Sequence, residues 1–339
     1  MNDGRPGPTP PEFPAPIRAT SADLPAAAAA ALADVRALPE TGARSWIVVP
    51  TADGAFRLSA LAWGPVDGRP LLLVHGVTSS ARTYWRLGPA LGALGWRAVA
   101  LDLPGHGRTG GGRDGRGFRF EETARVVAAF ARAAFGRTTG GERPPSDDGS
   151  PSGAPRPGGE ARLAVIGHSW GAVLAAHLPT VGLRPSRIVL LDPPVMDGAA
   201  LRAMVDDADS QPDRSPERAL ATIRALKPTW GEGDQVVKAE ALTQLIGEAA
   251  AAVLLGNGEW DGGLGPLTDP KARGVPIWIV RGEDASGSLT PSSSLPRFAA
   301  IIGPDHILTI ADGEHSPQRQ RVEATLVALL RALGDAEPG

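Results

Sequence analysis

The chain has 339 residues, of which 42% are hydrophobic and 21% are charged, a balance typical of a globular protein with one large core. Its formal net charge of −3 argues against a nucleic-acid-binding protein, which would carry a basic surface. The sequence contains no cysteine, which excludes disulfides, thiolate metal sites and a cysteine nucleophile. No apolar run reaches the roughly 18 residues that a membrane-spanning helix needs.

The N-terminal part, residues 1–44, is predicted to be an extension of the main fold. Residues 1–20 are rich in Pro and Gly and are expected to be disordered, and residues 21–38 predict one helix capped by Ser21. The run Ala26–Ala33 has the length of the apolar part of a secretion signal, but acidic residues surround it and no basic segment precedes it. We therefore expect a cytoplasmic protein.

The next part of the chain alternates between short apolar runs and helical patterns. Two strand patterns flank a turn at Ala52-Asp53-Gly54, which predicts a hairpin of Ser45–Pro50 and Phe56–Trp63. Further β-rich runs, apolar on both faces like buried parallel strands, are Leu71–Val74, Ala98–Leu101, Leu163–Ile166, Ile188–Leu191, Ile277–Val280 and Ile307–Ile310. Helical patterns lie between them at Ala81–Leu94, Glu121–Phe135, Trp170–Leu178 and Pro317–Leu333. The order predicts an α/β fold with a mostly parallel, doubly wound sheet.

Two segments interrupt this alternation. Residues 138–159 are nearly devoid of apolar side chains and predict a flexible surface insertion. Residues 193–274 show no strand pattern and carry helical patterns at Ala199–Asp207, Pro216–Leu226 and Val236–Leu255. We expect this second segment to be an inserted helical cap, and residues 45–192 with 275–335 to form the core.

A candidate nucleophile lies in Gly167-His168-Ser169-Trp170-Gly171, a G-x-S-x-G pattern. The pattern alone is weak in a chain with 43 glycines, but a strand precedes it and a helix follows it. A sharp strand-to-helix turn presents the serine hydroxyl at the carboxyl edge of the sheet, and the helix N-terminus favours negative charge there. The alternative is an ordinary glycine-rich loop with an exposed serine.

Two other strands also end in glycine-rich turns. The first runs into His75-Gly76-Val77, where the backbone N–H of Val77 is a candidate oxyanion donor together with that of Trp170. The second continues into Asp102-Leu103-Pro104-Gly105-His106-Gly107-Arg108-Thr109. These two motifs and the G-H-S-x-G elbow, in this order, resemble the α/β-hydrolase superfamily over roughly residues 45–335. The resemblance implies the fold and a nucleophile at Ser169, and it does not specify the substrate.

The second turn also fits another class of protein. Gly105 to Gly110 match the G-x-G-x-x-G pattern of dinucleotide-binding folds. That loop must open a helix, whereas this chain continues with Gly111-Gly112-Arg113-Asp114-Gly115, a poor helix start. No nucleotide and no other cofactor are therefore expected.

The expected general base is His315. Among six histidines it alone lies in a loop between the last predicted strand and the final helix, where it can reach Ser169 at the carboxyl edge of the sheet. The loop resembles the G-x-G-H-x loop of the family, with Glu314 where many members carry Gly. The alternative is a solvated loop histidine.

The acid that orients the imidazole is left open between two loops. The family places it after either of two strands, which here end before Asp192 or before Arg281-Gly282-Glu283-Asp284. Asp192 is favoured because Pro193 and Pro194 would hold it in one pose. Asp284 is the first alternative and Glu283 the second, although both stand slightly earlier than the usual family position.

Aromatic residues near these motifs predict a pocket for a small, mainly apolar substrate. The candidates for its lining, each of which is more often a core residue, are His75, Tyr84, Trp85, Trp230 and Trp260, and Met196 and Met204 belong to the same segment as the last two. No cluster has metal-ligand spacing, so no metal is expected.

Three functions remain open. The first is hydrolysis of an ester, lactone or similar bond through an acyl-enzyme on Ser169. The second uses the same residues for carbon–carbon bond hydrolysis or cofactor-free perhydrolysis, both of which the superfamily contains. The third is a ligand-binding protein that has kept the fold without turnover. The expected partner is a small-molecule substrate, with no nucleic acid and no membrane, and the oligomeric state is not predicted.

Overall fold

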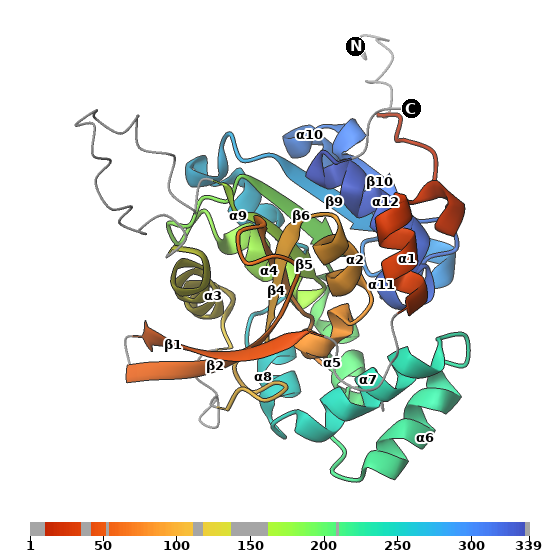
Figure 1. Ribbon diagram of the computed structural model, residues 1–339. Helices are drawn as coiled ribbons and strands as arrows, with labels where there is room; N and C mark the ends of the chain where they lie inside the picture. Colours follow the sequence, from red (N-terminus) through yellow and green to blue (C-terminus); the bar gives the residue numbers. More distant parts are fainter. Residues whose placement is uncertain are drawn as a thin grey trace, which may run out of the picture.

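A computed structural model describes residues 11–34, 42–51, 54–110, 118–136, 162–207 and 210–335, and every statement below concerns these residues. They form one eight-stranded sheet with helices on both of its faces (Figure 1). The predicted α/β class with a mostly parallel sheet is confirmed. The predicted insertion at 138–159 lies outside the described residues, as do residues 1–10.

The sheet has the strand order β1-β2-β4-β3-β5-β6-β9-β10. The first two strands form an antiparallel hairpin, β2 pairs antiparallel with β4, and the remaining pairs are parallel. Each predicted strand is found, with its ends within two residues of the expected ones. The bounds are β1 Ala43–Thr51, β2 Gly54–Trp63, β3 Arg69–Val74, β4 Trp96–Leu101, β5 Ala164–His168, β6 Arg187–Leu191, β9 Ile277–Arg281 and β10 Ile307–Thr309.

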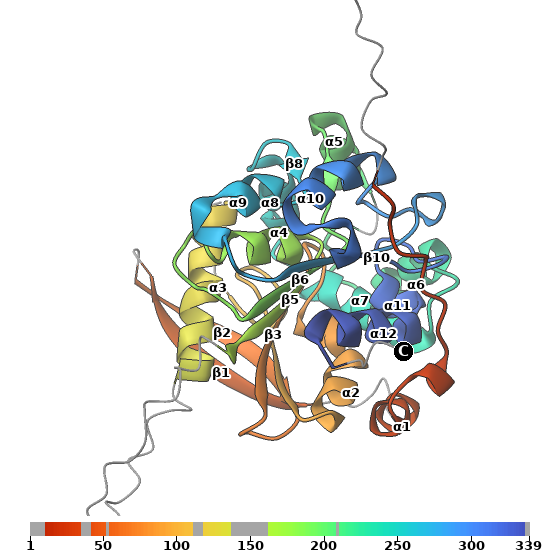
Figure 2. The same ribbon diagram turned by 90° about the horizontal axis from the view of Figure 1, so that it is seen from above.

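Helices cover the two faces of the sheet as two layers (Figure 2). One layer contains α3 (Phe120–Phe135), α4 (Trp170–His177) and α10 (Leu295–Ile302). The other contains α1 (Ala26–Asp34), α2 (Leu87–Ala93) and α12 (Val322–Leu333). The central strands are buried on both sides, which explains their continuous apolar sequence. None of the helices in the described ranges combines the length and the apolar character that crossing a membrane requires.

Two long helical patterns are interrupted in the structure. The pattern at Ala81–Leu94 consists of a 3-10 helix, η2 (Ala81–Tyr84), followed by α2. The pattern at Pro317–Leu333 consists of α11 (Pro317–Gln320) and α12, because Arg321 between them has φ −127° and ψ 57°, outside the helical region. The single predicted helices are therefore wrong at these two points.

The segment 193–274, called the helical insert below, leaves the sheet after β6 and returns before β9. It contains α5 (Gly198–Asp206), α6 (Pro216–Leu226), α7 (Glu232–Gln244), α8 (Ala249–Leu255) and α9 (Leu264–Thr268). Where one helix was expected over Val236–Leu255, Leu245 has an extended backbone and ends α7. The expected absence of strands is also wrong, since β7 (Val195–Met196) and β8 (Trp260–Asp261) pair antiparallel.

The N-terminal segment is more ordered than expected. Residues 11–20 are part of the structure: the Ile17 N–H donates to the Thr309 carbonyl at 2.7 Å, and the Ala311 N–H donates to the Ile17 carbonyl at 3.0 Å. This pairing satisfies backbone groups on the outer edge of β10. The helix that follows begins later than predicted, at Ala26, because a 3-10 turn capped by Thr20, and not by Ser21, precedes α1. The end of the predicted helix, residues 35–38, lies outside the described residues.

Candidate active site

Ser169 stands on the turn between β5 and α4. Its backbone is in an unusual conformation, with φ 56° and ψ −123°, of the kind that is stored at functional sites. The two glycines of the motif make this turn possible. A Cβ at Gly167 would lie 2.0 Å from the Gly171 carbonyl oxygen, and one at Gly171 would lie 2.2 Å from the Val74 carbonyl oxygen. The strand, turn and helix therefore pack too tightly for any side chain at either position.

His315 lies against this serine. Its Nε2 is 2.9 Å from Ser169 Oγ, and its Nδ1 is 2.7 Å from Asp192 Oδ2. A carboxylate only accepts hydrogen bonds, so the proton is assigned to Nδ1, and Nε2 is left to accept the serine O–H. The His315 side chain is 25% exposed whereas Asp192 is fully buried. The structure thus brings together a hydroxyl, an imidazole and a carboxylate that follow three different strands.

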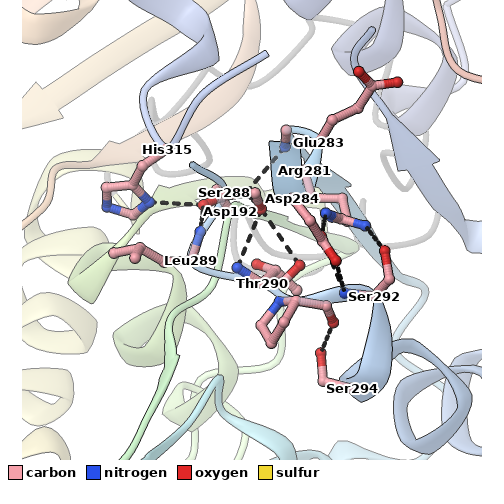
Figure 3. A network of polar contacts seen from close by, with 12 residues as sticks. Asp192, Arg281, Glu283, Asp284, Ser288, Leu289, Thr290, Ser292, Ser294 and His315 are labelled. Carbon is pink, nitrogen blue, oxygen red and sulfur yellow. Dashed lines mark hydrogen bonds and ion pairs between the residues drawn. The ribbon is translucent and has the colours of Figure 1, made fainter. Parts of the chain in front are cut away.

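Asp192 is held rigidly behind the imidazole (Figure 3). Its Oδ1 accepts from the Gly282 N–H at 3.0 Å and the Ser288 hydroxyl at 2.5 Å, and its Oδ2 also accepts from the Leu289 N–H at 2.8 Å. Burial by itself would raise the pKa of Asp192. The hydrogen bond and charge of His315, together with the hydrogen bonds from Ser288 and Gly282, outweigh the effect of burial. They lower the pKa of Asp192 below its ordinary value.

The two alternative acids are engaged elsewhere. Asp284 accepts from the Arg281 guanidinium and from the Ser292 N–H at 3.0 Å, and Glu283 Oε2 accepts from the Asp312 N–H at 3.0 Å. Figure 3 shows Asp284 and Glu283 pointing away from His315. Burial would raise the pKa of Asp284, but the bonds from Ser292 and the nearby Arg281 outweigh it and lower this pKa. The geometry therefore favours Asp192 among the three candidates.

The turn after β3 approaches Ser169 closely. A Cβ on Gly76 would lie 2.8 Å from the Cβ of Ser169, so only glycine fits there. The next residue, Val77, lines the same cavity as Ser169, and Trp170 is the first residue of α4. Across the described ranges, the structure gives neither of these two backbone N–H groups an intramolecular acceptor. Both are positioned as candidate oxyanion donors.

The other residues of the two turn motifs shape the backbone. His75 is fully buried, with Nδ1 at 2.8 Å from the Gly76 carbonyl and Nε2 accepting from the Leu103 N–H at 3.0 Å. Burial lowers its pKa well below the ordinary value, which keeps the ring neutral. Asp102 accepts from the Ala81 N–H at 2.8 Å. The possible dinucleotide loop at Gly105–Gly110 opens no helix in the part described, and α3 begins only at Phe120.

A cavity of about 220 Å³ opens beside Ser169 and His315. Trp230 and Trp260, both from the helical insert, line it as predicted from the sequence. Its other apolar lining residues are Val77, Pro194, Met196, Met204, Leu254 and Leu289. Among the residues that the structure describes, no group of three or more His, Cys, Asp or Glu could hold a metal ion.

Three residues expected in the pocket lie elsewhere, so that expectation is wrong. His75 is beneath the turn, as described above. Tyr84 is fully buried and donates its hydroxyl to the Val74 carbonyl at 2.7 Å. Trp85 donates its indole N–H to Asp234 Oδ1 at 3.0 Å. The reason is the 3-10 helix η2, which turns the Tyr84 and Trp85 side chains inward and against the helical insert.

Charged residues also line the cavity, although none of them was expected there from the sequence. They are Asp207, Lys227, Lys238, Glu314 and Arg319. Lys238 donates to the Thr78 carbonyl at 3.1 Å, and Arg319 donates to the Ser79 hydroxyl at 3.3 Å. Lys238 stands on α7 and Arg319 on α11, and a charged residue in a helical pattern is expected on a solvated face. Contacts between the insert and the core, such as that of Lys238 with Thr78, place side chains beside the cavity that a helical pattern does not reveal.

His168, adjacent to the nucleophile, contacts the histidine loop directly. Its Nε2 is 2.9 Å from the His315 carbonyl, and the two imidazole centroids are 5.0 Å apart. Burial and the proximity of His315 lower the pKa of His168 to about 3. A neutral ring donates from Nε2 to the carbonyl, so His168 helps to fix the backbone that carries His315.

The fold and these motifs agree with comparisons to known proteins. A model of the alpha/beta hydrolase family matches residues 71–328, most of the chain. The chain belongs to the alpha/beta hydrolase family. This membership confirms the resemblance noted in the sequence, and it covers β3 through most of α12.

Individual relatives of this chain are more distant. Lipase LipV of Mycobacterium tuberculosis (strain ATCC 25618 / H37Rv) is 29% identical over 181 residues, which cover 52% of this chain and 56% of the lipase. A serine hydrolase-like protein of Danio rerio is 37% identical over 91 residues, 25% of this chain and 28% of that protein. The chain thus spans about a quarter to a half of the length of these relatives.

Solved structures share the fold. An esterase from Rhodococcus sp. ECU1013 has a TM-score of 0.63 at 17% identity, over 86% of this chain and all of the esterase. An N-formylmaleamic acid deformylase from Pseudomonas putida S16 has a TM-score of 0.61 at 19% identity, over 84% of this chain and all of that protein. These two proteins cleave different substrates on one fold, so the fold does not specify the substrate.

Proposed function

We propose that this protein is a serine hydrolase that cleaves an ester, a lactone or a similar bond of a small molecule through an acyl-enzyme. The observation that carries the proposal is the chain of contacts from Ser169 Oγ to His315 Nε2 at 2.9 Å and from His315 Nδ1 to Asp192 Oδ2 at 2.7 Å. The family supplies the reaction class, since its named relatives here include a lipase and an esterase.

In the proposed mechanism, Ser169 Oγ attacks the substrate carbonyl carbon while His315 Nε2 takes the hydroxyl proton. The carbonyl oxygen becomes an oxyanion that accepts from the Val77 and Trp170 N–H groups. His315 then returns its proton to the leaving group as the carbon–leaving-group bond breaks. Water, deprotonated by His315, attacks the acyl carbon; the bond to Ser169 Oγ then breaks, the carboxylic acid leaves, and His315 returns the proton to Ser169 Oγ. Asp192 holds the imidazole and stabilises its charged form throughout.

The cavity limits the size of the substrate. About 220 Å³ accommodates a small molecule, and the apolar residues Met196, Met204 and Trp260 favour a substrate with an apolar part. In this proposal the helical insert serves as the cap that completes the pocket, because Trp230 and Trp260 both come from it. A cytoplasmic location stays a prediction from the sequence.

Labelling with a fluorophosphonate tests the proposal, with Ser169→Ala as the matched control. We expect one label on the wild-type protein and none on the variant. A wild-type protein that remains unlabelled would contradict an activated serine. A panel of aryl esters, lactones and vinylogous diketones, with an assay for peracid formed from added hydrogen peroxide, then separates the ester or lactone reaction from carbon–carbon hydrolysis and perhydrolysis. A folded protein that takes up no label and turns over no member of the panel would favour a binding function.

A further inference from the structure

The residue before His315 reaches into the helical insert. Glu314 Oε1 accepts a hydrogen bond from the indole N–H of Trp230, and Glu314 Oε2 lies 3.7 Å from Lys227 Nζ. Lys227 caps the end of α6, and Trp230 lies between α6 and α7. All three side chains line the cavity that Ser169 and His315 share. A single side chain therefore ties the insert to the loop that carries His315.

The indole of Trp230 is held at further points. The Arg319 guanidinium carbon is 5.0 Å from the ring centroid and Lys227 Nζ is 5.5 Å from it, both within range for cation–π attraction. Arg319 is itself fixed, since it donates to the Asp234 carbonyl at 3.0 Å. The indole is 6% exposed. Trp230 is thus a buried wall of the cavity that is held by contacts from three side chains.

The backbone that carries Glu314 is fixed as well. The Glu314 N–H donates to Gln320 Oε1 at 3.0 Å, and the neighbouring Gly313 carbonyl accepts from the Glu283 N–H at 2.8 Å. A Cβ on Gly282 would lie 2.2 Å from that Gly313 carbonyl oxygen, so the two loops are in close contact. Because Glu314 and His315 share this fixed backbone, the position of the indole is set relative to the imidazole.

The location of the wall indicates which part of the substrate it meets. A leaving group takes its proton from His315 Nε2, so its oxygen must lie within hydrogen-bond reach of that nitrogen. The leaving group therefore occupies the His315 side of Ser169. Trp230 lines the same cavity as His315 and is hydrogen-bonded to Glu314, the residue next to His315 in the chain. We assign the indole to this side of the cavity.

We propose that Trp230 selects substrates with a small leaving group, and that Glu314 is the positioning residue that holds the indole in place. This inference rests on the proposed serine hydrolase function and adds a substrate class to it, namely esters of short alcohols. The outer carbons of a long alcohol cannot be buried past Trp230. Each methylene that finds no apolar contact lowers kcat/KM about fourfold relative to a methylene that is buried.

A series of methyl, butyl and hexyl esters of one acid tests the proposal. All three form the same acyl-enzyme, so differences in kcat/KM report the leaving group alone. We expect Trp230→Ala to raise the hexyl-to-methyl ratio of kcat/KM at least tenfold. Glu314→Ala should shift the ratio in the same direction by less, and the double variant should match Trp230→Ala, because both changes act on the same wall.

The matched variants separate positioning from a merely structural role. Glu314→Gln keeps an oxygen that accepts from the indole N–H, and we expect it to retain the wild-type ratio. Trp46→Ala removes an indole that is 41% exposed on β1, and it should leave the ratio unchanged. A loss of folded protein lowers all three rates equally and does not move the ratio; if Trp230→Ala does not fold, Trp230→Leu replaces it.

The result that would overturn the inference is a hexyl-to-methyl ratio within twofold of wild type in the Trp230 variant. If Glu314→Ala lowers kcat/KM of all three esters by the same factor, the proposed positioning role of Glu314 is refuted. Both results require a wild-type enzyme that hydrolyses the esters and takes up the fluorophosphonate. A wild type that does neither would contradict the proposed function itself, and with it this inference.

Discussion

Replacing Asp192 by Asn removes the negative charge behind His315 and changes little else in volume. Each carboxylate oxygen accepts from two donors, one of which is a backbone N–H, from Gly282 or from Leu289. The amide of an asparagine must turn its NH₂ toward one of these N–H groups, whichever way it is placed. The variant therefore loses at least one buried hydrogen bond, which costs roughly 1–3 kcal/mol of stability.

The effect on catalysis should be larger than the effect on stability. Without the carboxylate, the imidazolium that forms when His315 takes the Ser169 proton loses its buried counter-charge at 2.7 Å. Loss of the acid in a catalytic triad lowers kcat by about 10⁴-fold. We expect Asp192→Asn to lower kcat by about 10³–10⁴-fold, which corresponds to ~4–5.5 kcal/mol in the barrier.

The assay is hydrolysis of a p-nitrophenyl ester, with the folded fraction measured by thermal unfolding. Asp284→Asn and Glu283→Gln are the matched controls, and we expect both within about tenfold of wild type because neither side chain contacts His315. A kcat of Asp192→Asn above one tenth of the wild-type value, or an equal loss in Asp284→Asn, would refute the assignment of the acid.

Three further predictions concern single side chains near the site. Gly76→Ala places a Cβ 3.3 Å from Ser169 Oγ and should lower kcat/KM of ester hydrolysis by about 10²-fold. Activity near the wild-type level would show that the backbone of the turn can shift to accommodate the methyl group. The pKa of His168 is about 3 in the folded protein and near 6.5 in the unfolded chain, so the free energy of unfolding falls as the pH drops from about 6.5 toward 3. In urea titrations between about pH 6 and pH 4, His168→Gln should reduce this pH dependence by up to about 1.4 kcal/mol per pH unit. An unchanged pH dependence would contradict the buried neutral ring. Tyr84→Phe leaves the Val74 carbonyl without its hydroxyl donor and should lower the free energy of unfolding by about 1 kcal/mol, while an equally stable variant would argue against this hydrogen bond.

Much of the fold could be predicted from the sequence because its signals are local. Buried parallel strands read as short apolar runs, and every predicted strand is found within two residues at each end. The tight elbow was also visible, since Gly167 and Gly171 mark a turn that no other residue fits. The helix interruptions at Leu245 and Arg321 could not be predicted, because neither position carries Gly or Pro. Only the backbone conformation in the structure shows these breaks.

The candidate site was predictable only in part. Asp192 and Asp284 both follow strands at one edge of the sheet. The two prolines after Asp192 favoured it, but no local signal shows which carboxylate faces the imidazole and which faces Arg281. The pocket lining depends on long-range packing. Trp85 donates a hydrogen bond to Asp234 and does not line the cavity, whereas Arg319 lines the cavity although its sequence context predicts a solvent-exposed position. A single sequence carries no record of such contacts.

Residues 11–20 show the same limit. Their composition is that of a disordered segment, yet Ile17 completes the edge of β10 through two backbone hydrogen bonds. Backbone pairing needs no particular side chain, so composition could not reveal it.

In the proposed mechanism, Ser169 carries the acyl group during turnover. Rapid acid quenching of a reaction with a p-nitrophenyl ester, followed by mass analysis of proteolytic peptides, tests it directly. We predict one acyl group per chain, located on the peptide that contains Ser169 and absent from Ser169→Ala. Steady turnover with no acylated peptide, or with the acyl group on another residue, would contradict the account.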